Sequence, residues 1–156
     1  KSPEFFLTTF EPTHRQLVKL TAIFDGLGRM DDLPELWKVT AERAIEFAEK
    51  HPNDSNGAEA WLVAAENYRL LGNKSRQRAV LKEAVSTQPN DALLALMFGR
   101  ALFDEGRYQE AADHLKEALR HYPDDVPLRQ LAEDAVRRSQ SGERSAVRTA
   151  SHHDDE

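Results

Sequence analysis

The chain has 156 residues, of which 40% are hydrophobic and 31% are charged, a composition typical of one globular domain or a short array of repeats. Its 21 Lys and Arg residues are outnumbered by 27 Asp and Glu residues. The resulting net charge of -6 argues against nucleic acid as the main partner, because binding phosphates requires a basic face. The absence of cysteine excludes disulfides, thiolate catalysis and cysteine-ligated metal sites.

Two features of the sequence bear on its location. No apolar run approaches the ~18 residues of a membrane span, so we expect no direct insertion into a membrane. The first residue is Lys1 rather than Met and no signal-peptide pattern follows it, so we expect an excised fragment or a processed product. A cytoplasmic location is favoured, with the bacterial periplasm as the alternative for a piece of a longer chain.

Residues 1–12 form an apolar N-terminal segment. It contains four large apolar side chains, Phe5, Phe6, Leu7 and Phe10. These are too many for a freely solvated tail, so we expect the segment to pack on the first helices or to occupy a groove.

Residues 13–52 are predicted to form a pair of helices. In the first, residues 13–27, apolar residues recur at the three- and four-residue spacing of one helix face, and Gly28 ends the helix. The second spans about residues 36–50 and ends before Pro52. We interpret this pair as a degenerate version of the two units that follow it.

The middle of the chain contains an internal repeat. Residues 58–91 and 92–125 align without a gap, so that each residue corresponds to the residue 34 positions later. The matching pairs are Gly72 with Gly106, Leu81 with Leu115, Ala84 with Ala118 and Pro89 with Pro123. So many identities at one offset predict two copies of a single structural unit.

Each copy is predicted to contain two helices. The four expected helices span residues 58–71, 74–87, 93–103 and 108–121. Gly72 and Gly106 supply the left-handed backbone that ends the first helix of each unit. Pro89 and Pro123 end the second helix, because proline cannot continue a helix. The pattern therefore predicts an all-α array of antiparallel helix pairs.

The last predicted helix covers residues 126–138. Its apolar residues lie on one face and are Leu128, Leu131, Ala132, Ala135 and Val136. A lone amphipathic helix at this place would cap the exposed face of the preceding unit. Residues 139–156 are rich in Ser, Arg and acidic residues and contain few apolar ones, which predicts a disordered tail.

Bulky and small residues recur at fixed places in the two units. In the first unit they are Trp61, Ala64, Ala65, Tyr68, Gln77, Leu81, Ala84 and Pro89. In the second they are Ala95, Phe98, Gly99, Leu102, Ala111, Leu115, Ala118 and Pro123. This pattern resembles the tetratricopeptide repeat family, although Gln77 replaces the small residue expected at its position. The resemblance implies that residues 13–138 form a right-handed α-solenoid with a C-terminal capping helix, which acts as a scaffold or adaptor between proteins.

In that family the first helix of each unit lines the concave surface of the array. Register then places eight residues on this surface: Glu59, Leu62, Glu66, Arg69, Leu93, Leu96, Arg100 and Phe103. Met97 borders them and completes the predicted groove. Apolar centres flanked by charges suit an amphipathic helix or an extended peptide. We therefore expect a protein or peptide partner in this groove.

One variant of such a groove, a Lys/Asn/Arg clamp that holds a C-terminal carboxylate pair, is not expected. The clamp positions hold Leu62, Glu66, Leu96 and Arg100. Only Arg100 is a cation, and Glu66 would repel a carboxylate.

The sequence predicts no catalytic, cofactor or metal site. His114 and His121 fall on one helix face, but no third ligand accompanies them, and the His and acidic residues at 152–156 lie in the predicted tail. No glycine-rich phosphate loop, zinc-binding His-Glu-x-x-His helix or nucleophile elbow is present. We therefore expect a non-enzymatic protein. Two alternatives stay open: a self-assembling homo-oligomer, and a regulatory or positioning domain of a larger catalytic or membrane-anchored chain.

Overall fold

The computed structural model describes residues 22–23, 26–52 and 54–150, with side chains described as far as residue 142. Every regular element among these residues is a helix. The elements are η1 (Met30–Asp32), α3 (Leu33–Lys50), α4 (Ser55–Leu70), α5 (Lys74–Thr87), α6 (Ala92–Asp104), α7 (Tyr108–His121) and α8 (Val126–Ala150). The chain divides into two compact units, and the division falls within α6, between Leu94 and Ala95. The apolar segment 1–12 and most of the helix predicted over residues 13–27 lie outside the described residues.

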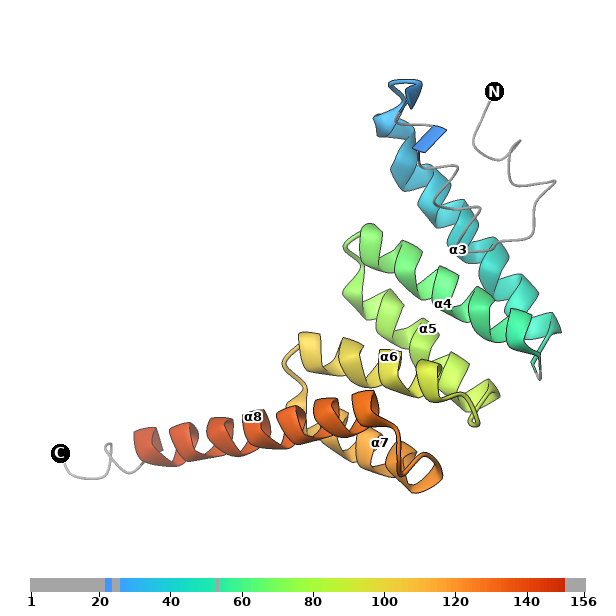
Figure 1. Cartoon of the computed structure of the whole chain (residues 1–156). Coiled ribbons are helices and arrows are strands. Elements are labelled where there is room, and N and C mark those ends of the chain that lie inside the picture. The colour runs from blue at the N-terminus through green and yellow to red at the C-terminus, as the bar shows by residue number, and fades with distance from the viewer. Residues whose placement is uncertain (1–21, 24–25, 53, 151–156) are drawn as a thin grey trace. The chain divides into compact units, whose positions relative to one another are not determined.

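The first unit contains α3, α4 and α5, which pack one after the other with alternating direction (Figure 1). Small side chains line the contact of α3 with α4, where Ala41, Ala44 and Ala48 are completely buried. Small residues let two helices approach closely, and larger side chains such as Trp61 fill the space around them. Helix α3 therefore packs on α4 as part of the same unit.

Helix α3 begins earlier than the sequence predicted. It starts at Leu33, and the short helix η1 leads into it. Pro34 lies in its first turn, where the missing amide proton of proline has no helical partner to lose. Proline here favours a helix start, whereas the sequence interpretation began the helix at about residue 36.

The connection from α3 to α4 is tight and requires glycine. Gly57 is buried, and a Cβ atom at this position would lie 2.0 Å from the backbone oxygen of His51. The Asp54 carboxylate accepts a hydrogen bond from the Asn56 amide at 2.6 Å and so caps the start of α4. Gln88, at the end of α5, donates its side-chain amide to the same His51 oxygen at 3.4 Å. The end of α5 is thereby tied to this connection.

The glycines after α4 and α6 end these helices in the same way. Gly72 has a φ of 70° and Gly106 a φ of 77°, both in the left-handed region. In each case the residue after the glycine donates its amide to the carbonyl five residues earlier, at 2.9 Å. Equivalent residues therefore make equivalent helix ends, and the predicted breaks are confirmed.

The second unit contains α6 from Ala95 onward, α7 and α8. Helix α7 runs antiparallel to both neighbours, so α6 and α8 run in the same direction (Figure 1). Gly99 sits against α7 so closely that a Cβ atom there would lie 2.5 Å from Leu115 Cδ2. Leu115 and Leu128 are completely buried in this unit. These contacts hold α6 and α8 against α7.

Helix α8 corrects the prediction for the end of the chain. It was expected to end at residue 138 and to be followed by a disordered tail, but it continues to Ala150. Ser139 Oγ still contacts α7, because it donates to Gln109 Oε1 at 2.7 Å. Beyond that point the sequence lacks proline. Adding a residue to an existing helix costs far less free energy than forming the first helical turn. The sequence interpretation took the loss of apolar residues for the loss of helix.

Candidate functional site

A cavity of about 340 Å³ lies in the second unit, with α6 and α8 as its walls. Its lining residues are Leu96, Met97, Arg100, Pro127, Gln130, Leu131 and Asp134. Leu131 is only 7% exposed and forms the floor, whereas Arg100 and Asp134 reach the surface. The cavity therefore has an apolar interior and a charged rim, and its volume falls in the range of about 300–1,000 Å³ seen in ligand sites.

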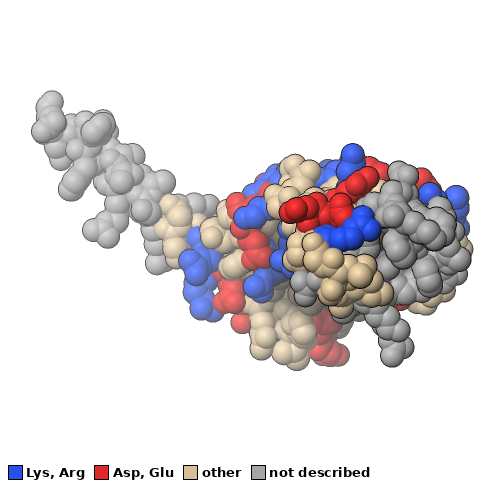
Figure 2. All heavy atoms as spheres, turned by 90° about the horizontal axis from the view of Figure 1, so that it is seen from above, with Lys and Arg blue, Asp and Glu red and all other residues tan. Residues whose placement is uncertain are grey.

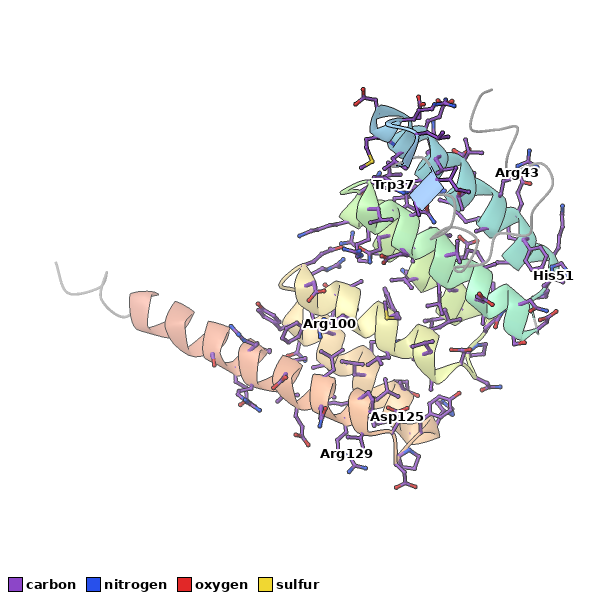
Figure 3. All side chains as sticks on the ribbon, turned by 45° about the horizontal axis from the view of Figure 1, so that its top comes forward. Trp37, Arg43, His51, Arg100, Asp125 and Arg129 are labelled. Carbon is purple, nitrogen blue, oxygen red and sulfur yellow. The ribbon has the colours of Figure 1, made fainter. Side chains whose placement is uncertain are left out.

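Three residues predicted for the concave surface meet at this cavity: Leu96, Met97 and Arg100. They come from one face of α6, on two successive turns of the helix. Figure 3 shows Arg100 on this helix. Leu96 and Met97 are half-buried, so part of each side chain is open to an incoming group.

Phe103, also predicted for this surface, does not line the cavity. Its ring packs edge-on against Tyr108 of α7, with 5.1 Å between the ring centroids. Phe103 is half-buried and joins α6 to the start of α7. Its main observed contact is therefore structural.

The other predicted groove residues belong to the first unit. On α4, Glu59 is exposed, Leu62 is half-buried, and Glu66 forms an ion pair with Arg69 at 2.6 Å. Leu93, at the start of α6, is 51% exposed. Their role in binding stays a prediction, because none of them lines the cavity in the second unit.

The sequence interpretation missed the wall that α8 contributes. Pro127, Gln130, Leu131 and Asp134 were not proposed as site residues, because this helix was interpreted only as a cap. The 34-residue offset extends to them, since they correspond to Leu93, Leu96, Met97 and Arg100 of α6. The cavity is therefore lined by equivalent repeat positions on two helices, α6 and α8. Extending the 34-residue alignment to α8 would have predicted its lining residues.

Each charged residue of the rim is already paired within its own helix. Arg100 Nε lies 3.1 Å from Asp104 Oδ1 on α6, and Arg137 Nη2 lies 3.2 Å from Asp134 Oδ1 on α8. All four side chains are more than half exposed. Exposed ion pairs contribute about 0.2–1 kcal/mol each, so a partner can replace either of them at small cost.

The surface charge is mixed beyond the cavity as well. On the face seen in Figure 2, acidic and basic side chains of the described residues are interspersed rather than gathered into a field of one sign. Such a surface offers no extended basic track for a nucleic acid backbone.

The two histidines considered as metal ligands have different surroundings. His114 is half-buried between α6 and α7, where its Nε2 lies 2.8 Å from the Ala95 carbonyl oxygen and its ring meets Phe98 edge-on. Burial lowers the pKa of His114, and the hydrogen bond to Ala95 opposes this shift only in part. His121 is exposed at the end of α7. Within the described part of the chain, no cluster of three or more His, Asp or Glu side chains is arranged to bind a metal ion.

Antiparallel helices with equivalent ends, and equivalent positions lining a cavity, define an α-helical repeat protein. Models of the tetratricopeptide repeat match the chain twice, over residues 58–91 and over residues 92–125. Residues 58–125 are therefore two tetratricopeptide repeats, with the unit boundaries that the internal alignment predicted. A search of curated proteins finds no match. Tetratricopeptide repeats are in general modules for protein–protein interaction.

None of the helices in the described residues has the length and apolar character needed to cross a bilayer.

Proposed function

We propose that this chain is a protein-binding module that holds a segment of another polypeptide in the cavity between α6 and α8. The observation that carries the proposal is the coincidence of two independent results. The sequence analysis included Leu96, Met97 and Arg100 in the predicted groove, and the same three line the cavity. The general role of tetratricopeptide repeats supports the same conclusion.

The cavity walls are held in place before a partner arrives. Gly99 allows α6 to lie directly on Leu115, and the buried face of α8 packs on α7 through Leu128 and Ala135. Since these contacts lie behind the cavity, binding requires little ordering of the walls. Preformed sites gain affinity because less conformational entropy is lost on binding.

In this proposal the chain acts by binding and performs no reaction itself, as a scaffold or adaptor. The composition supports this part, because the chain lacks cysteine and carries none of the familiar catalytic motifs. Regulation of a larger catalytic chain would use the same binding surface.

Selection of random peptides displayed on phage tests the proposal while the partner is still unidentified. Peptides enriched on the wild-type protein should be lost on a Met97→Glu variant, because the new carboxylate would be placed inside the apolar cavity. Val126→Glu is the matched control, since Val126 is 53% exposed on α8 and does not line the cavity. Equal recovery of the peptides on both variants would contradict binding at this cavity.

Self-association is a second candidate, favoured by a separate observation. Near the N-terminal end of the described residues, Ile23, Leu27 and Met30 are each at least half exposed. Apolar residues gathered at one end of an array can pair with another copy. Sedimentation of the wild type and a Leu27→Glu/Met30→Glu variant over a concentration series tests this candidate, and a wild type that stays monomeric throughout would exclude it.

A further inference from the structure

We propose that the cavity binds a partner segment in one orientation, set by charge: an acidic residue over α6, apolar side chains in the cavity, and a basic residue over α8. This inference rests on the proposed function and names the chemistry of the segment that the site accepts. It is carried by the position of Arg100 and Asp134 on opposite walls of one cavity.

The apolar part of the segment follows from the size and lining of the cavity. A cavity of about 150 Å³ is large enough for a benzene-sized group. At about 340 Å³, the present cavity has room for two such groups. Leu96, Met97 and Leu131 surround them, and the only polar atom that these three side chains offer is the weakly accepting thioether sulfur of Met97. The segment therefore presents two apolar side chains on one face.

The charged part follows from the register of the two walls. Arg100 and Asp134 occupy equivalent positions, 34 residues apart, on helices that run in the same direction (Figures 1 and 3). They therefore stand at the same end of the cavity, one on each side of it. A segment that crosses from α6 to α8 meets a cation first and an anion second. In the reversed orientation each charge of the segment would face a like charge, which disfavours that orientation.

The two rim residues are free to exchange partners. Arg100 is 60% and Asp134 is 54% exposed, so neither has lost its hydration to the protein interior. Their ion pairs with Asp104 and Arg137 join neighbouring turns of the same helix, and such pairs stabilise a helix by only about 0.2–0.5 kcal/mol. Contact with a partner's charges replaces these pairs without burying an unpaired ion.

Peptide selection with a charge-swapped variant tests the inference. Random peptides displayed on phage are selected on the wild type and, separately, on Arg100→Glu/Asp134→Arg. We expect the wild type to enrich a motif with an acidic residue on one side of the apolar pair and a basic residue on the other. The swapped variant should enrich the same motif with its charges exchanged. A peptide selected on the wild type should bind the swapped variant about 10-fold more weakly, because its two ion pairs with the rim residues are replaced by two contacts between like charges.

A second charge swap provides the control. Glu117 and Arg120 form an exposed pair on α7 at 2.7 Å and do not line the cavity, so Glu117→Arg/Arg120→Glu should select the wild-type motif unchanged. Circular dichroism of each variant checks that the helices are retained.

The outcomes separate the inference from the proposed function. In one outcome, peptides are enriched on the wild type and lost on Met97→Glu, but the swapped variant selects peptides with the wild-type charge order or with no charge order. The cavity then binds peptides, and the proposed orientation by charge is wrong. If the wild type enriches no peptide, the proposed function fails together with the inference.

Discussion

Arg100 on α6 and Asp134 on α8 occupy the same position of two successive first helices and line opposite walls of one cavity. The repeat thus keeps the geometry of the position while its charge changes sign. The repeat position determines where a side chain lies, and the residue type determines which charge of a partner it binds. The predictions that follow test the packing that holds these helices and the site between them.

Gly99 is predicted to be required by the contact of α6 with α7. A Gly99→Ala variant should be destabilised by about 1 kcal/mol, because its Cβ would meet Leu115 at 2.5 Å and the cost of overpacking exceeds the gain in helix propensity. Gly142→Ala is the control, since a Cβ at Gly142 meets nothing within 4 Å. The control should gain about 0.5–1 kcal/mol in the free energy of unfolding in urea. Equal stabilisation of both variants would show that the close contact is absent.

Asp125 is predicted to set the start of α8 (Figure 3). Its carboxylate accepts a hydrogen bond from the Leu128 amide at 2.9 Å, as that of Asp91 does from the Leu94 amide at 2.8 Å. Asp125→Ala should lower the free energy of unfolding by about 1 kcal/mol, and Asp125→Ser should restore most of the loss, because serine also caps helices. Thermal unfolding of the two variants measures this difference, and an Asp125→Ser variant as unstable as Asp125→Ala would argue against capping.

Asn67 is predicted to reduce the stability of the first unit. It is completely buried, and its Nδ2 donates to the Val63 oxygen at 2.7 Å, but its Oδ1 has no hydrogen-bond partner. Asn67→Leu should therefore raise the free energy of unfolding by about 1 kcal/mol, since it replaces an unsatisfied polar group with an apolar one of similar size. Asn67→Asp should lower it by several kcal/mol, because it buries a charge. Chemical denaturation of both variants tests the pair, and a destabilised Asn67→Leu would indicate that Oδ1 has a partner in solution.

His114 is predicted to make the stability of the second unit depend on pH. Its pKa is lowered by burial from the ordinary value of 6.5, so the unfolded chain binds a proton more readily than the folded one. The contribution of neutral His114 is complete above pH 6.5 and is lost as the pH falls below that value. Melting temperatures between about pH 8 and pH 5 should fall more for the wild type than for His114→Gln. His121→Gln, on the exposed end of α7, should behave like the wild type.

Much of the helical framework was predictable from the sequence, because glycine and proline mark the ends of the helices in the two repeats. Helices α5 and α7 have the predicted bounds, residues 74–87 and 108–121. The extension of α8 was not predictable from apolar periodicity, since few apolar residues follow Ser139 in the sequence. The start of α3 was missed because Pro34 suggests a loop as readily as a first helical turn.

The site was predicted in part. Register identified the α6 wall, because the family pattern assigns its face, and it would equally have identified Gln130 and Asp134 had the last helix been aligned with the units. Register does not give the contacts of individual side chains. The packing of Phe103 on Tyr108, and the pairing of Arg100 with Asp104, depend on rotamers that only the folded chain determines.

Site-specific photo-cross-linking tests the central claim most directly. A benzophenone side chain introduced at Gln130, on the cavity wall, is compared in lysate of the source cells with the same group at Lys116, exposed on α7 away from the cavity. Binding in the cavity predicts a protein adduct at position 130 that is absent at position 116 and is lost when Met97→Glu is added. Identical adducts at both positions, or an adduct at position 130 that persists with Met97→Glu, would contradict it.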